Sequence, residues 1–149
     1  MKSVALVAAL LALVSSQTVL AAGKSSGSCY TPTDMEAEQA IRFMTDVMVV
    51  SSACQDSIYA QFRLRNKDAI IRYQKAMIAH FHGQSAFDSW NTSLANQASM
   101  RQNGVPTAQM CQQAAEMLKQ ASMLDAKGLH EYAAAKAATL SASYTRCGR

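Results

Sequence analysis

The chain of 149 residues lacks the short motifs that accompany most enzymatic chemistry. It has no G-x-S-x-G nucleophile elbow and no Gly-rich phosphate loop, and no cysteine is free to act as a nucleophile if all four are bridged. Asp56, Asp88 and His130 could serve in catalysis, but the sequence scatters them. These absences favour a protein that is not an enzyme and needs no cofactor. An unrecognised hydrolase is the least favoured alternative.

Long apolar runs are also lacking, apart from one at the N-terminus. Lys2 is followed by VALVAALLALV at residues 4–14, which is shorter than the roughly 20 apolar residues that span a bilayer. A positive start, a short apolar middle and small residues before a cleavage point define a secretory signal peptide. We assign residues 1–23 to it, with cleavage after Ala21 or Gly23. Because no later segment is long and apolar enough for a transmembrane helix, we expect a soluble periplasmic or secreted protein.

The cysteines lie in none of the spacings that bind zinc or haem, and no pair forms C-x-x-C. An even number of cysteines in an exported protein normally forms disulfides. The mature chain of roughly 126 residues is long enough to bury a core, so bridges would reinforce the fold and need not create it. We predict two structural bridges among Cys29, Cys54, Cys111 and Cys147.

Charge of one sign is not abundant. Removing the leader removes Lys2, and thirteen of the 14 Lys and Arg residues then remain against 10 Asp and Glu. So small an excess is poor support for nucleic-acid binding. One local concentration of positive charge is either a solvated connection between helices or a binding site for an unknown envelope protein or another anionic surface. It comprises Arg63, Arg65, Lys67, Arg72 and Lys75.

After the leader, apolar residues recur at helical spacing and no segment has the alternating pattern of a strand. The first helix is predicted to begin at a capping box formed by Thr33 and Glu36 and to run to about residue 60. The charged segment 63–68 then interrupts the pattern.

Three more helices are separated by clear stop signals. The second is predicted to end at about residue 82, where Gly83 fits the position just past a helix end. The third stops at Asn103-Gly104, and Pro106 suits the first turn of the fourth. A fifth segment follows Gly128 and places apolar residues on one side as far as Tyr144.

Short connections favour antiparallel neighbours, so we predict an all-α, up-and-down helical bundle of four to five helices stapled by disulfides. It forms a single domain over residues 33–149. A small, polar, flexible segment at residues 24–32 precedes it.

The alternating directions of the helices also suggest how the cysteines pair. Cys54, near the end of the first helix, would lie beside Cys111, near the start of the fourth. Cys29 cannot reach Cys54, because most of a helix lies between them, about 30 Å at 1.5 Å per residue. By elimination Cys29 pairs with Cys147, either within the chain, with one tail folded back, or between two chains.

His80 and His82 are candidate metal ligands with an unfavourable spacing. Positions two apart on a helix differ by about 200°, whereas a helical pair of ligands needs i, i+4 spacing. We expect instead that His80 is partly buried and that His82 lies near a helix C-terminus, where the helix dipole favours a protonated ring.

Eight methionines follow the leader, and most lie on the apolar stripes. Methionine is ordinary core filling, although Met-rich surfaces also bind varied partners, and thioethers select Cu(I). A carrier of a small apolar ligand or soft metal in the bundle interior is therefore an alternative function.

Three stretches carry a resemblance to known proteins: MTDVMVVSSACQDSIYAQF, FHGQSAFDSWNTSLANQAS and QMC. Together they resemble a loose family of uncharacterised secreted α-helical proteins from bacteria, with a cysteine, an L-A-N-x-x-S segment and a later cysteine. Here these correspond to Cys54, residues 94–99 and Cys111, within a similarity that covers about residues 38–120. The resemblance implies a periplasmic setting and a Cys54–Cys111 bridge, and it implies no activity.

The sequence therefore predicts a non-catalytic periplasmic helical-bundle protein. We expect it to act by contacts with a protein or with the envelope, in an accessory, inhibitory or assembly role.

Overall fold

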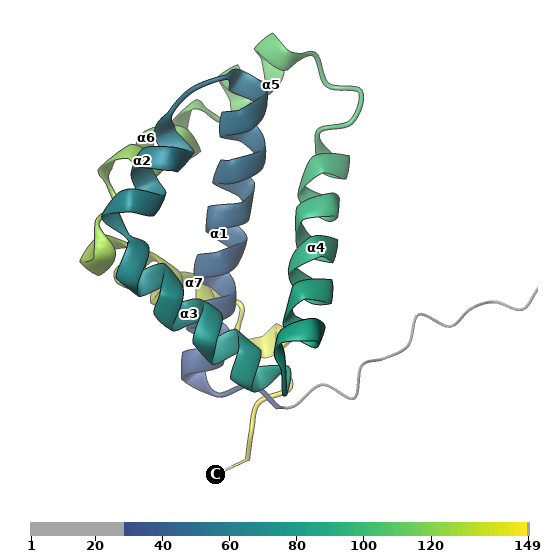
Figure 1. The fold of residues 1–149 in the computed structure, drawn as a ribbon, viewed down its shortest axis with the longest axis vertical. Coiled ribbons are helices and arrows are strands. Elements are labelled where there is room, and N and C mark those ends of the chain that lie inside the picture. The colour runs from purple at the N-terminus through teal and green to yellow at the C-terminus, as the bar shows by residue number, and fades with distance from the viewer. Residues whose placement is uncertain (1–28, 149) are drawn as a thin grey trace, which may run out of the picture.

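The computed structural model describes residues 29–148, and these residues form an all-α fold stapled by two disulfides, as the sequence predicted. The predicted signal peptide, residues 1–23, lies outside the described residues. Figure 1 shows the arrangement of the helices. They are α1 (Pro32–Cys54), α2 (Ile58–Arg65), α3 (Lys67–His80), α4 (Gln84–Arg101), α5 (Thr107–Gln113), α6 (Ala115–Met123), α7 (Ala126–Thr139) and the 3₁₀ helix η1 (Ser141–Ser143).

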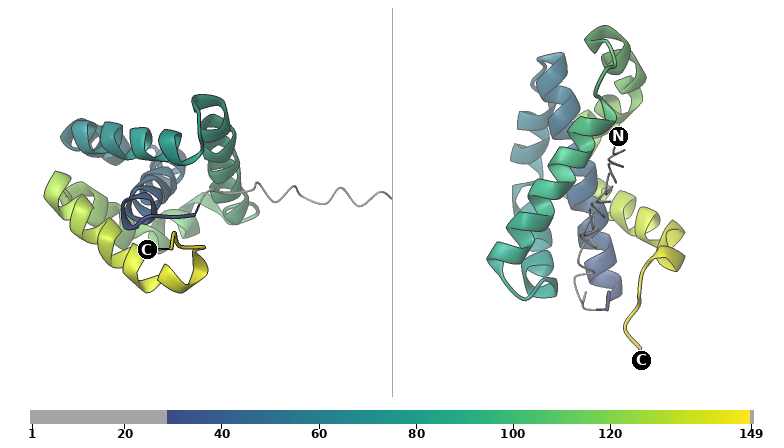
Figure 2. Two further views of the ribbon diagram at one scale, coloured as in Figure 1. Left: turned by 90° about the horizontal axis from the view of Figure 1, so that it is seen from below. Right: turned by 90° about the vertical axis from the view of Figure 1, so that its right-hand side faces the viewer.

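Helix α1 is the centre of the molecule. It packs against each of the helices α2 to α7, and the view from below in Figure 2 shows them arranged around it. Twelve of its 23 residues are buried, and these include polar side chains as well as the apolar stripe. A helix buried on most sides must satisfy its polar groups internally. Accordingly, the Thr45 hydroxyl donates to the Ile41 carbonyl oxygen, and Gln39 donates to the Tyr144 hydroxyl.

The capping box of α1 lies two residues earlier than the sequence predicted. The Asp34 amide donates to Thr31 Oγ1 at 3.2 Å, and the Thr31 amide donates to Asp34 Oδ2 at 2.9 Å. Pro32 then occupies the first turn, where its missing N–H costs nothing. Thr33 is therefore inside the helix, and Glu36 is released for contacts with other helices.

Helix α1 also ends earlier than predicted, at Cys54 instead of about residue 60. Gln55 adopts the left-handed conformation (φ 56°) and its N–H bonds back to the last turn. Asp56 then accepts hydrogen bonds from the Ser51 hydroxyl and from the Ile58 amide, which starts α2. The reversal therefore depends on local side-chain capping, which apolar periodicity does not report.

The charged segment 63–68, predicted to interrupt the helices, separates α2 from α3 only at Asn66. The Asn66 amide donates to the Phe62 carbonyl oxygen and the Ile70 amide donates to that of Asn66, so the helical ladder almost continues. Asn66 is fully buried, and its Nδ2 also donates to the Leu124 carbonyl oxygen at the end of α6. Since the predicted fourth helix is likewise divided at Ala114, the five expected segments become seven helices.

The last helix crosses the N-terminal half of α1 and does not climb its full length. Tyr132 of α7 lies against Phe43 with ring centroids 4.5 Å apart, and Tyr144 bonds to Gln39. The C-terminal tail consequently returns to the start of α1. The Tyr30 amide donates to the Thr145 carbonyl oxygen at 2.8 Å, so this part of the expected flexible lead-in is held by the tail.

Both predicted bridges are present, and they hold the two ends of α1. Cys54–Cys111 joins its C-terminal end to α5 across a sequence separation of 57, and Cys29–Cys147 joins the residues before its start to the tail across a separation of 118. The second bridge forms within one chain because the tail folds back. In the chain-entropy model, the shorter loop alone contributes about 4 kcal/mol.

A single carboxylate of α1 joins three helices. The Tyr73 hydroxyl of α3 donates to Glu36 Oε1 at 2.7 Å, and His130 Nδ1 of α7 lies 2.7 Å from the same oxygen. Burial and the hydrogen bond to Glu36 raise the pKa of the Tyr73 phenol above its ordinary value near 10. The neutral phenol is therefore the form that the folded state stabilises.

Alkaline titration should reveal the Tyr73 contact. Above about pH 10 the unfolded phenol loses its proton while folded Tyr73 keeps it, so the stability that this group provides declines as pH rises. We expect Tyr73→Phe to lower the free energy of unfolding at pH 7 by about 1 kcal/mol. The gap between the two proteins should narrow between about pH 10 and 11. Urea unfolding followed by circular dichroism measures it, and a gap that stays constant with pH would contradict the assignment.

Candidate functional site

A cleft of about 350 Å³ lies over α1 between the α2–α3 arm and α4. In Figure 1 the α2–α3 arm and α4 diverge above their connection at the base, and α1 runs between them. The volume is within the range of small-ligand pockets. The residues that line it are Met44, Thr45, Met48, Tyr59, Arg63, Lys67, Ile70, Ile71, Gln74, Asn91 and Ala95.

The interior of this cleft is apolar and adaptable. Met44 and Ile70 are buried, Met48 is half-buried, and Ile71 is 38% exposed. Methionine side chains adjust to partners of different shape. By contrast, Met77 is fully buried in the core cluster, as ordinary core filling.

Cationic side chains border the same cleft. The Arg63 guanidinium lies 5.6 Å from the centroid of the Tyr59 ring, and Lys67 follows one turn later. Arg63, Lys67, Ile71 and Lys75 are spaced by four, so they follow one side of the α2–α3 arm, and all four are exposed. We call these four residues the cationic stripe. Within residues 29–148 no ion pair engages its three charges.

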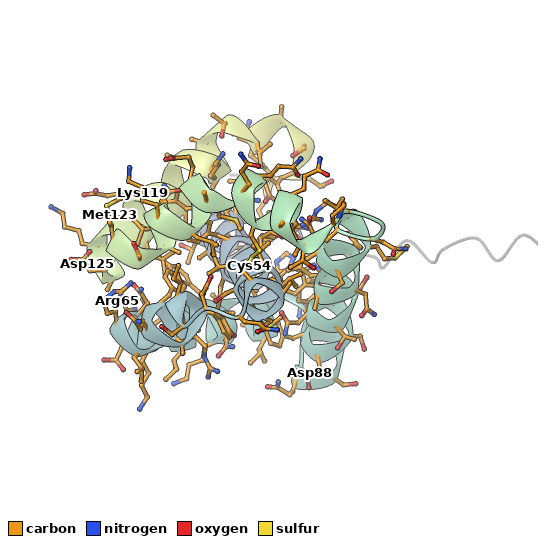
Figure 3. All side chains as sticks on the ribbon, turned by 90° about the horizontal axis from the view of Figure 1, so that it is seen from above. Cys54, Arg65, Asp88, Lys119, Met123 and Asp125 are labelled. Atoms are coloured by element: carbon orange, nitrogen blue, oxygen red, sulfur yellow. A yellow bond between two sulfur atoms is a disulfide. The ribbon has the colours of Figure 1, made fainter. Side chains whose placement is uncertain are left out.

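Arg65, which the sequence grouped with this cluster, has a different role. Its Nη2 donates to the Ala121 carbonyl oxygen at 2.9 Å, close to the end of α6. Figure 3 shows Arg65 near Met123 and Asp125. Two residues separate by about 200° around a helix, so Arg63 and Arg65 cannot serve one surface. Arg65 therefore ties α2 to α6.

Arg72, the fifth predicted residue, is exposed but does not line the cleft. It is offset by about 100° from Ile71 around α3, toward the side that carries Asp68. The structure thus brings together Arg63 and Lys67 at the cleft, with Lys75 along the same stripe, and separates Arg65 and Arg72 from them.

The two candidate metal ligands have different surroundings. His80 is buried, with Nδ1 3.5 Å from Asp34 Oδ2 and its ring 4.1 Å from that of Tyr30. His82 follows the end of α3 and is exposed, with φ 59°. Among residues 29–148, no group of three or more His, Cys, Asp or Glu side chains is placed to hold a metal ion.

The three residues considered for catalysis serve separate local contacts. Asp56 caps the start of α2, and Asp88 accepts a hydrogen bond from Gln84 on α4, where Figure 3 shows it far from the labelled residues of α2 and α6. His130 contacts Glu36. The structure does not gather them into one site.

Sequence analysis missed Tyr59, Ile70 and Ile71 as parts of the cleft. The signal for Ile71 was available, because its spacing of four from Lys67 places both on one side of a helix. The participation of Met44 and Met48 beside them depends on how α1 packs against α3, which periodicity within one helix does not specify.

Comparison with family models, with curated proteins and with solved structures finds no match to this chain. Across residues 29–148, no helix combines the length and the apolar character that crossing a bilayer requires.

The separate roles of Arg63 and Arg65 can be tested by stability. Arg65→Ala removes a charged donor from a backbone carbonyl and should lower the free energy of unfolding by about 1 kcal/mol, since partial exposure reduces the value of such a bond. Arg63→Ala is the matched control and should change it by less than about 0.5 kcal/mol. Chemical denaturation measures both, and equal losses would contradict the assignment.

Proposed function

We propose that this chain is a non-catalytic, exported bacterial protein that acts by contact, and that its cleft receives an acidic amphipathic helix of an envelope protein. The family resemblance described above is part of the same proposal. Two disulfides support an oxidising, extracytoplasmic location, because such bridges are rare in the cytosol.

The observation that carries the proposal is the combination of an adaptable apolar cleft with an uncompensated cationic border. Met44, Met48 and Ile71 offer apolar surface, while Arg63 and Lys67 stand at the same cleft without ionic partners among the described residues. A partner with an apolar face flanked by carboxylates complements both features.

The length of the cationic stripe favours a helix over a single lipid headgroup. Twelve residues separate Arg63 from Lys75, which corresponds to about 18 Å along a helix. One headgroup spans only part of that distance, whereas acidic residues repeated every turn of a helix could meet each cation. Long-range attraction between the opposite charges would also accelerate the encounter.

A site-specific crosslink tests this proposal. Replacing Ile71 with a photoreactive phenylalanine analogue in the native host should yield one main protein adduct. Mass spectrometry should place the crosslinked residue of the partner in an acidic amphipathic helix. A synthetic peptide of that helix should then bind the purified protein, with an affinity that weakens as salt is added.

Charge reversal provides the variant and its control. Arg63→Glu with Lys67→Glu should weaken peptide binding at least about tenfold, since each reversal replaces an attraction of up to about 1 kcal/mol by a repulsion. Arg72→Glu changes the same charge on the same arm and should leave binding within about twofold. A lipid adduct, or equal losses in both variants, would show that the proposal is wrong.

A further inference from the structure

A second cleft, of about 470 Å³, lies between the start of α1 and the returning C-terminal tail. It is remote from the cationic stripe, since its walls come from α1, the tail and the residue before Thr31. Its lining includes Tyr30, Glu38, Gln39, Arg42, Leu140 and Tyr144. The Cys29–Cys147 bridge adjoins it and fixes the two segments that carry its tyrosines.

The cleft contains a carboxylate that the fold satisfies on one side only. Glu38 is 4% exposed, and Arg42 Nε and Nη2 both lie 2.6 Å from its Oε1. Glu38 Oε2 is also buried and receives no hydrogen bond of normal geometry. A buried carboxylate oxygen without a donor costs a few kcal/mol, so it needs an explanation in a well-packed protein.

Two phenol rings form a wall beside this carboxylate. The ring centroids of Tyr30 and Tyr144 are 4.7 Å apart, and the Tyr144 hydroxyl is held by Gln39. Burial and the neighbouring Glu38 carboxylate raise the pKa of the Tyr30 phenol, which places its hydroxyl close to Glu38. Leu140, which is 44% exposed, adds apolar surface at the rim.

Arg42 offers a donor next to the free acceptor. Its hydrogen bonds to Glu38 use Nε and Nη2, so Nη1 remains for an acceptor, and its side chain is 39% exposed. The guanidinium also lies 5.9 Å from the centroid of the Trp90 ring, and Trp90 is the only tryptophan in the chain. The cleft therefore presents an anionic acceptor and a cationic donor one helical turn apart, with a combined charge of zero.

We propose that this cleft binds a small zwitterion, an α-amino acid with an apolar side chain. Its ammonium group donates to Glu38 Oε2, its carboxylate accepts from Arg42 Nη1, and its side chain packs against Tyr30, Tyr144 and Leu140. A neutral pair of opposite charges favours a ligand that carries both charges, because a pure cation is repelled by Arg42 and a pure anion by Glu38. Since Oε2 is buried, the Tyr30 phenol shifts aside when the ammonium enters.

Titration with matched ligands tests the proposal on the unaltered protein. Alanine, leucine and phenylalanine are the probes, and the fluorescence of Trp90 reports movement of Arg42. At least one of the three should bind saturably with a dissociation constant below about 1 mM. Phenethylamine, which lacks the carboxylate, and 3-phenylpropionate, which lacks the ammonium, should each bind at least about tenfold more weakly than phenylalanine, as expected when a charge-assisted hydrogen bond is lost.

Variants locate the site. Glu38→Gln should weaken phenylalanine binding at least about tenfold and leave 3-phenylpropionate within about twofold, because that analogue makes no ammonium contact. Arg63→Gln, at the other cleft, should leave both unchanged. Absence of saturable binding by all three amino acids, equal affinity for phenylalanine and its two analogues, or an unchanged affinity in Glu38→Gln would overturn the proposal.

Discussion

The structure depends on one helix that is buried by all the others. Helix α1 contacts every other helix, and its apolar side chains, among them Ile41, Phe43 and Val47, are the middle of the core cluster. Burial of this surface is the main favourable contribution to folding, at roughly 25 cal/mol per Å² of apolar area. The same burial requires partners for the polar groups of α1, and most are supplied by neighbouring helices or by the C-terminal tail.

Both ends of this central helix are fixed covalently, and the two clefts lie along it. Cys54 joins its C-terminal end to α5, while Cys29 joins the segment before it to the tail. Helix α4 packs on α1 through a narrow stripe, Phe87, Leu94 and Ala98, which leaves room beside it for the cleft that carries the cationic stripe. The zwitterion cleft instead exists because the tail covers the first turns of α1. The two proposed binding sites thus follow from how one helix is covered.

Much of the fold follows from the sequence because apolar periodicity and cysteine number report burial directly. They predicted the helices, the two bridges and the topological pairing of Cys54 with Cys111. The ends of α1 were misplaced, since Thr31 and Asp56 act through hydrogen bonds that several neighbouring polar residues could have made equally well. The zwitterion cleft was not predictable, because Glu38 and Tyr144 are 106 positions apart in the sequence and meet only after the tail folds back. The charged cluster was predicted as a group, but only helical geometry separates Arg63 from Arg65.

Hydrogen exchange measures most directly whether α1 holds the structure together. If the other helices depend on it, amides between Ala37 and Val50 exchange only when the whole protein unfolds, at the free energy of global unfolding. Amides of α4, which has few buried side chains, should exchange faster through local opening. Amides of α1 that exchange as fast as those of α4 would contradict the central place given to this helix.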